Sequence, residues 1–434
     1  MSSCDVVHGD CTEVLPRWAE DGLRFDAVVC DPPYHLTSIV KRFGAANAAP
    51  AQFGRDGAFA RSSRGFMGQT WDGGDIAFQP ETWAAVLSVM KPGAHLIAFG
   101  GSRTWHRIAC AIEDAGFEIR DTLMWVYGSG FPKSHNIANS IDKHNGMPNR
   151  GHRIATANRR HPDGTLEPNG ENLPRYEARN EAGKPWEGWG SALKPAVEPI
   201  ILARKPLEGT LAANTLTHDC GGLNIDECRV SLAAGADASQ LRTMNRGQRT
   251  EDTSGQKWGL SKTAADTPQV VRPDGRWPPN LLHDGSPEVL ACFPASAGQQ
   301  GDLRGHANTR PTKICFGDMP PAADHPKRGD FGSAARFFPS FPFTGDERRL
   351  LYHTKANTSD RAGSKHPTVK PVALMRWLCR LVTPLGGLIL DPFAGSGTTG
   401  AAAIAEGFNA VLVEQNADYV ADIRKRLDAV VSLR

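Results

Sequence analysis

Two stretches of the chain hold residues that could do chemistry, and the first is Asp31-Pro32-Pro33-Tyr34. Because neither proline has a backbone N–H, the stretch offers acceptors, on the Asp31 carboxylate and the Pro32 carbonyl, beside the flat ring of Tyr34. Such a set fits a planar group that bears an NH2, for example a nucleobase. The tetrapeptide alone is equally typical of a turn that ends a strand, with Asp31 capping a helix.

The second stretch is rich in glycine and precedes a predicted helix. Its residues are Asp391, Pro392, Phe393, Ala394, Gly395, Ser396, Gly397, Thr398, Thr399 and Gly400. Glycines let a backbone approach a ligand closely and adopt positive φ. No lysine follows Gly400, so this is not a P-loop, and Glu414, roughly 20 residues on, could accept hydrogen bonds from ribose hydroxyls. The pattern predicts a nucleoside-containing cofactor; a tight strand-to-helix turn with a surface glutamate is the alternative.

Both stretches follow predicted strands, and strands alternate with helices around them. The expected strands are 4–8, 25–30, 94–99, 117–127, 198–203, 387–390 and 410–413. The expected helices are 12–19, 80–90, 104–115, 372–383, 401–406 and 418–427. Thr12 is the expected N-cap of the first helix, and Lys91-Pro92-Gly93 should form a break. The alternation predicts an α/β fold with a doubly wound, mainly parallel sheet.

Composition excludes several classes of protein. The chain has 434 residues, 40% of them hydrophobic, and a net charge of +2, which is ordinary for a globular protein. No long apolar run and no signal peptide is visible, so we expect no membrane association. Nine cysteines without any CxxC pair indicate free thiols in a reducing, cytoplasmic setting, and the spacing of His218, Cys220 and Cys228 matches no zinc pattern, so no metal site is expected.

Three motifs in one order resemble a known family. They are Asp31 to Tyr34, then His366-Pro367-Thr368-Val369-Lys370-Pro371, then Asp391 to Thr399. Together they are similar to the β group of S-adenosylmethionine-dependent DNA amino-methyltransferases, in which the acidic Pro-Pro-Tyr stretch precedes the target-recognition region and the cofactor loop comes last. The resemblance covers roughly residues 1–130, 196–206 and 365–434.

The resemblance assigns expected roles to single residues. The expected catalytic residues are Asp31, Pro32, Pro33 and Tyr34. The expected S-adenosylmethionine-binding residues are Asp10 (adenine), Glu414 (ribose), Lys370 and Pro371 (methionine moiety), and Asp391, Phe393, Ala394, Gly395, Ser396, Gly397 and Thr398 (cofactor loop). Trp125 and Tyr127 stand where the family places aromatic contacts near the flipped base. The implied fold is a circularly permuted Rossmann-like methyltransferase sheet, which begins at the usual third strand and ends at the usual second strand.

The implied activity is methylation of an exocyclic amine in duplex DNA, with the base flipped out of the helix and no covalent intermediate. The acid at position 31 favours adenine N6, and cytosine N4 is the alternative. An RNA or protein-amide methyltransferase, an inactive DNA-binding relic and a dehydrogenase are weaker alternatives. Protein-amide enzymes usually carry Asn in place of Asp31, and a dehydrogenase would place the glycine-rich loop at the start of the chain.

The same resemblance predicts how the chain is divided. A catalytic half spans 1–127 and includes a basic loop at 35–79, and a cofactor-binding half spans 366–434. An insertion at 128–197 and a target-recognition region at 205–365 form an irregular lobe, and a returning strand at 198–204 lies between them. Basic residues of these regions would contact DNA phosphates. The sequence identifies neither the recognition site nor a partner nuclease, and it is compatible with a homodimer.

Overall fold

The computed structural model describes residues 3–34, 75–128, 134–147, 176–231, 275–296, 312–314, 317–319, 332–341 and 369–432. Nearly all of the predicted basic loop at 35–79 lies outside these residues, as do His366, Pro367 and Thr368. The chain divides into two compact units. The larger consists of Met1–Gly128 and Val197–Arg434, and the smaller is Ser129–Ala196.

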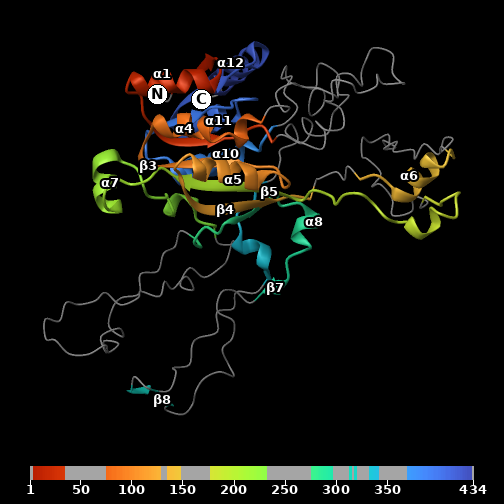
Figure 1. Ribbon diagram of the computed structural model, residues 1–434. Coiled ribbons are helices and arrows are strands. Elements are labelled where there is room, and N and C mark those ends of the chain that lie inside the picture. Colours follow the sequence, from red (N-terminus) through yellow and green to blue (C-terminus); the bar gives the residue numbers. More distant parts are fainter. Residues whose placement is uncertain are drawn as a thin grey trace. The chain divides into compact units, whose positions relative to one another are not determined.

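An eight-stranded sheet forms the centre of the larger unit (Figure 1). In spatial order its strands are β1 (Cys4–His8), β12 (Asn409–Glu414), β11 (Leu388–Asp391), β2 (Phe25–Cys30), β3 (Met90–Phe99), β5 (Val197–Arg204), β4 (Glu118–Val126) and β6 (Leu281–His283). β5 runs antiparallel to both of its neighbours, and the other pairs are parallel. The first strand of the chain lies beside the last one, so the permuted strand order that the sequence predicts is confirmed.

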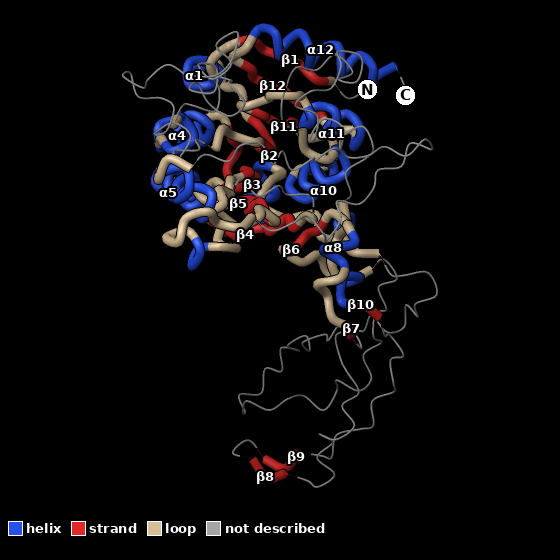
Figure 2. Tube along the Cα trace, turned by 90° about the vertical axis from the view of Figure 1, so that its right-hand side faces the viewer, coloured by secondary structure: helices blue, strands red, loops and turns tan. Residues whose placement is uncertain are grey.

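Helices cover both faces of this sheet (Figure 2). One face carries α1 (Cys11–Glu20), α4 (Pro80–Ser88) and α5 (Trp105–Asp114), and the other carries α10 (Val372–Val382), α11 (Thr398–Glu406) and α12 (Ala417–Ser432). All of β2 is buried. Ala27 and Val29 belong to the apolar cluster that includes α10, and Val28 and Cys30 to the cluster that includes α4 and α5. Because both faces of β2 are covered, its sequence is apolar at every position except one, the acid Asp26.

Both units also contain shorter elements. In the larger unit these are α7 (Leu211–His218), α8 (Pro287–Leu290), β7 (Ala295–Ser296), β8 (Thr312–Ile314), β9 (Gly317–Met319) and β10 (Gly332–Ser333). The smaller unit contains α6 (Ile137–His144). There the buried Asp142 carboxylate accepts hydrogen bonds from the Tyr176 hydroxyl at 2.7 Å and from the backbone N–H groups of Arg179 and Asn180.

The structure corrects three local predictions. Asp10, rather than Thr12, caps α1, because its carboxylate accepts hydrogen bonds from the Thr12 backbone and side chain. The predicted break at 91–93 instead lies within β3, where a register shift between Phe25 and Ala27 of β2 accommodates Pro92 and a left-handed Gly93. Part of the predicted irregular lobe joins the main sheet as β6, a strand of three residues that is too short to show a periodicity.

Candidate active site

The predicted site residues gather at the carboxyl edge of the sheet. β11 pairs with β2 in parallel, with Leu390 opposite Val28, so the two strands end side by side. Asp31 to Tyr34 follow β2, and Phe393 to Thr398 follow β11. The predicted catalytic and cofactor stretches therefore follow neighbouring strands, although most residues of the protein lie between them in sequence. Ligands of open α/β sheets bind at this edge.

Lys370 forms the centre of a polar cluster at the end of β2. Its Nζ lies 2.8 Å from Asp31 Oδ2 and 3.1 Å from Glu198 Oε2, and it donates to the Tyr34 hydroxyl at 3.0 Å. The Tyr34 hydroxyl in turn donates to Asp31 Oδ1 at 2.7 Å. The Lys370 ammonium also lies over the rings of Tyr34 and Phe99. Two predicted motifs are thus joined through one ammonium group.

Burial and charge set the protonation of this cluster. Burial alone would favour the neutral Lys370 amine, but Asp31 and Glu198 outweigh it and hold the pKa of Lys370 above its usual value. Burial raises the pKa of Glu198, and the Lys370 charge opposes that rise. Burial, followed by the Asp31 charge, raises the pKa of Tyr34 well above its usual value. Lys370 is therefore a cation at neutral pH, and Tyr34 remains a hydrogen-bond donor.

The backbone around Tyr34 fixes its ring. Thr104, which begins α5, donates from its hydroxyl to the Tyr34 carbonyl at 2.8 Å. Gly101 lies against the ring, and a Cβ there would come within 3.1 Å of Tyr34 Cδ2. Pro32 is buried, whereas 28% of the Asp31 side chain is exposed. Asp31 is thus accessible from outside, while the groups that hold it are largely buried.

The glycine-rich loop after β11 turns back onto the end of β12. Gly395 and Gly397 have φ values of 52° and 72°, which favour glycine. The Gly395 N–H donates to Glu414 Oε2 at 2.8 Å, and the Asn416 N–H donates to Oε1 of the same carboxylate at 2.9 Å. The loop and the predicted ribose-binding acid are therefore in direct contact. Burial raises the pKa of Glu414, and these backbone donors oppose the rise.

Asp391 lies at the base of the same loop. It is 2% exposed, and Oδ1 accepts a hydrogen bond from the Phe393 N–H at 3.0 Å. Burial raises the pKa of Asp391 to about 7, although a hydrogen bond from Thr399 opposes the shift. Arg426 of α12 holds the outer side of the loop through the Ser396 carbonyl and the Thr398 hydroxyl.

The remaining predicted residues lie around these two groups. Asp10 accepts a hydrogen bond from the Gln415 side chain at 3.1 Å, so it adjoins the end of β12. The Phe393 ring packs edge-on against Trp83, and Ala394 is buried. Pro371 caps α10 and places Lys370 at its start. Trp125, predicted near the flipped base, is 2% exposed within the core and packs on Tyr127.

Glu198 also belongs to the cluster around Lys370, although the sequence predicts no role for its side chain. The sequence places Glu198 only in a returning strand. β5 is antiparallel, so its first residues reach the edge where the parallel strands end. The available signal was a carboxylate at the head of an apolar run, Pro199 to Ala203, where a buried charge needs a partner.

A comparison with known protein families places this chain. A family model described as DNA methylase, of the N6/N4 type, matches residues 25–425. The chain belongs to this N6/N4 DNA methylase family. The matched residues include both Asp31 to Tyr34 and the glycine-rich loop after β11.

Curated relatives of this methylase match over short segments. A DNA adenine methyltransferase, YhdJ, of Escherichia coli (strain K12) is 46% identical over 63 residues, which is 14% of this chain and 21% of that protein. The type II methyltransferase M.HindIII of Haemophilus influenzae is 28% identical over 150 residues, 33% of this chain and 37% of that protein. The match thus spans well under half the length of either relative. Among solved structures, the M1.HpyAVI–SAM complex has 14% identity and a TM-score of 0.38, with 98% of this chain and 99% of that chain covered.

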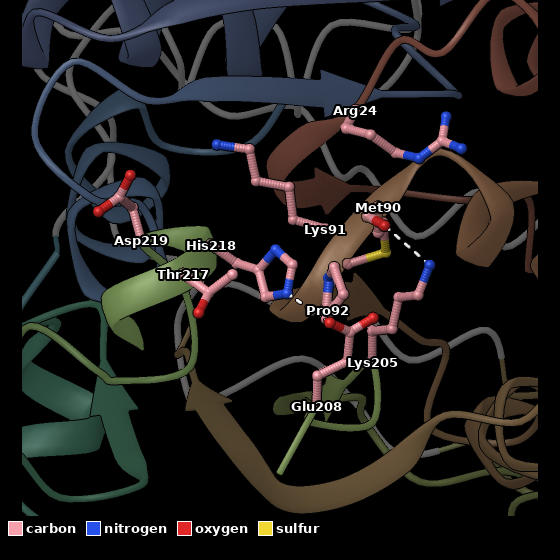
Figure 3. A pocket seen from close by; sticks show the side chains of 9 residues that line it. All are labelled: Arg24, Met90, Lys91, Pro92, Lys205, Glu208, Thr217, His218 and Asp219. Carbon is pink, nitrogen blue, oxygen red and sulfur yellow. Dashed lines mark hydrogen bonds and ion pairs between the residues drawn. The ribbon is translucent and has the colours of Figure 1, made fainter. Parts of the chain in front are cut away.

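A separate hollow of about 470 Å³ lies at the opposite edge of the sheet (Figure 3). It is lined by Arg24, Met90, Lys91, Pro92, Lys205, Glu208, Thr217, His218 and Asp219. Its cations have structural partners. Lys205 Nζ donates to the carbonyls of Leu87 and Met90, and His218 pairs with Glu208 at 2.8 Å. This hollow lies beside the amino ends of the parallel strands, away from the cluster around Lys370.

The described parts of the chain contain neither a membrane-spanning helix nor a metal-binding cluster. No helix there has both the length and the apolar character to cross a membrane. No group of three or more His, Cys, Asp or Glu side chains among those residues could hold a metal ion.

Proposed function

We propose that this methylase transfers a methyl group from S-adenosylmethionine to the N6 amine of an adenine that is flipped out of duplex DNA. The observation that supports it best is the side-by-side placement of two groups. An accessible carboxylate, Asp31, lies at the end of β2, and a left-handed glycine loop lies at the end of the adjacent β11. One can hold the amine and the other the methyl donor.

The residues around β11 and β12 fit S-adenosylmethionine. Gly395 and Gly397 leave two positions of the loop without a side chain, and Glu414 offers carboxylate lone pairs of the kind that bind ribose hydroxyls. Asp10 adds a second carboxylate beside the end of β12. When bound, S-adenosylmethionine supplies an electrophilic methyl group: its carbon bonds to the amine nitrogen while the sulfur–carbon electron pair stays on sulfur.

The protein must make a poor nucleophile react. The lone pair of a ring-conjugated amine is delocalised into the base. Hydrogen bonds from that amine to the Asp31 carboxylate and the Pro32 carbonyl localise the lone pair on nitrogen, and fixed positioning contributes most of the rest. Tyr34 stacks on the flipped base. After transfer the nitrogen carries a positive charge and releases one proton, and Asp31 is placed to accept it.

Substitution of Asp31 tests this division of roles. Asp31→Ala should abolish transfer of labelled methyl groups to duplex DNA and leave the affinity for S-adenosylmethionine within about threefold, because Asp31 is assigned to the amine rather than the cofactor. Calorimetry measures that affinity. Equal loss of transfer and of cofactor binding would contradict the assignment.

The methylated base decides between adenine and cytosine. Wild-type protein is incubated with labelled cofactor and, separately, with duplex DNA, RNA and protein. We expect label in duplex DNA only, and N6-methyladenine after digestion to nucleosides. N4-methylcytosine would instead support the alternative that the family allows. For the target sequence, we propose that the irregular lobe, 128–197 and 205–365, reads base edges and that basic residues of 35–79 and 128–365 contact phosphates.

A further inference from the structure

Glu198 has no part in the proposed reaction, although it belongs to the cluster around Lys370. It lies at the start of β5, in register with Trp125 of β4. Its Oε2 is 3.1 Å from Lys370 Nζ, and 21% of its side chain is exposed. A carboxylate this enclosed is costly unless it is paired, and Lys370 is its ion-pair partner.

The Lys370 ammonium forms ion pairs with two carboxylates. Its Nζ lies within ion-pair distance of both Asp31 and Glu198, and it donates a hydrogen bond to the Tyr34 hydroxyl. Bound to Asp31 alone, this cation would neutralise the carboxylate that the target amine needs. With Glu198 present, one positive and two negative charges leave the cluster with a net charge of −1.

We propose that Glu198 is a positioning residue that holds Lys370 between two carboxylates, so that Asp31 remains a strong acceptor and the cluster stays negative beside the amine. This inference rests on the proposed function. Methyl transfer places positive charge on the amine nitrogen, and a fixed negative charge in a partly buried site stabilises it more than it would in water. Lys370 meanwhile keeps Asp31 in place through their ion pair, and Glu198 holds Lys370 there through a second ion pair.

The test compares three variants in single-turnover methyl transfer to duplex DNA. Glu198→Gln keeps the size of the side chain and removes its charge. We expect the single-turnover rate to fall about 10- to 100-fold, and the S-adenosylmethionine concentration that gives half the maximal rate to change by no more than about twofold. Glu198→Asp keeps the charge and should recover most of the rate. The matched control is Glu118→Gln, which breaks the 2.6 Å ion pair with Arg204 at the other end of β5 and should leave the rate unchanged.

The pH profile separates a charge effect from a structural one. The charged or titratable groups that face Glu198 are Lys370, Asp31 and Tyr34. As the pH falls, Glu198 takes up a proton and the wild-type rate should approach that of Glu198→Gln. Asp391 titrates in both proteins, so its contribution cancels in the ratio of the two rates. That ratio should therefore shrink towards one at acid pH.

A second measurement needs no turnover. The infrared difference spectrum between free wild-type protein and Glu198→Gln should show an ionised carboxylate at neutral pH. A protonated Glu198 there, a rate ratio that is constant with pH, or equal losses in the Asp and Gln variants would overturn the proposal. If Glu198→Gln does not fold, the rate of Glu198→Asp decides, since a loss there contradicts a role for charge. Wild-type protein that labels no DNA would contradict the proposed function instead.

Discussion

At the scale of single residues, buried charges set the properties of the site. Lys370 and Tyr34 stand 336 positions apart in sequence, yet the lysine donates to the tyrosine hydroxyl. The proposed amine-binding end of the site thus depends on a cation from the other half of the chain. Asp391, at the proposed cofactor end, is buried, and this burial raises the pKa of its carboxyl.

The raised pKa of Asp391 predicts how stability changes with pH. The pKa is about 7 in the folded protein against an ordinary value of 3.8 for an aspartate carboxyl, so the folded state binds more protons than the unfolded state between these values. Stability should therefore fall as pH rises through this window, by on the order of 4 kcal/mol, and then level off. Asp391→Asn preserves an acceptor for the Phe393 N–H and removes the titration. Its free energy of unfolding, measured in urea across the window, should fall less than that of wild type.

A surface substitution provides the control for the change in net charge. Asp21→Asn, at the exposed end of α1, should follow the wild-type curve in the same titration. Parallel curves for wild type and Asp391→Asn would show that burial of this carboxyl does not destabilise the folded state.

At the scale of elements, the two ends of α11 offer a matched pair of glycines. Gly397 precedes the helix and Gly407 ends it, and both adopt left-handed φ values. A Cβ at Gly397 would lie 2.8 Å from Ile423 Cγ2 of α12, whereas a Cβ at Gly407 would meet nothing within 4 Å. Gly407→Ala should cost about 1 kcal/mol through its backbone alone. Gly397→Ala should cost about 2–4 kcal/mol, because overpacking against α12 is added.

The same pair separates stability from cofactor binding. Gly397 belongs to the proposed cofactor loop and Gly407 does not, so calorimetry should show weaker binding of S-adenosylmethionine only for Gly397→Ala. Equal effects of the two substitutions on unfolding in urea would rule out the contact with Ile423 as a constraint on the loop.

The elements that the sequence predicted are those with strong local signals. β2 is a buried apolar run and the loop between β11 and α11 has two glycines, so their positions follow from the local sequence alone. The missed features depend on tertiary contacts. Pro92 and Gly93 predict a break in regular structure, because the local sequence does not reveal the register shift between β2 and β3 that accommodates them. The role of Glu198 depends on the direction of β5, which no periodicity reveals.

At the scale of the whole molecule, the smaller unit is an insertion between two paired strands. β4 ends at Val126 and β5 begins at Val197, and these two residues are direct partners in the antiparallel ladder. The residues assigned to the small unit, Ser129–Ala196, therefore leave and re-enter the larger unit at adjacent points. Strands with such a register are commonly joined by a short hairpin loop.

Replacement of Ser129–Ala196 by about five glycine and serine residues should therefore yield a folded methylase core. Lys370, Asp31, Tyr34 and Glu198 all lie in the larger unit, so binding of S-adenosylmethionine should stay within about threefold of wild type, as measured by calorimetry. Affinity for duplex DNA should fall at least about tenfold, since the region removed carries an excess of Lys and Arg over Asp and Glu. Fluorescence anisotropy at several salt concentrations measures that loss and should show a smaller salt slope. An unchanged affinity and slope would mean that the insertion contributes no phosphate contacts, and that DNA is bound by the larger unit alone.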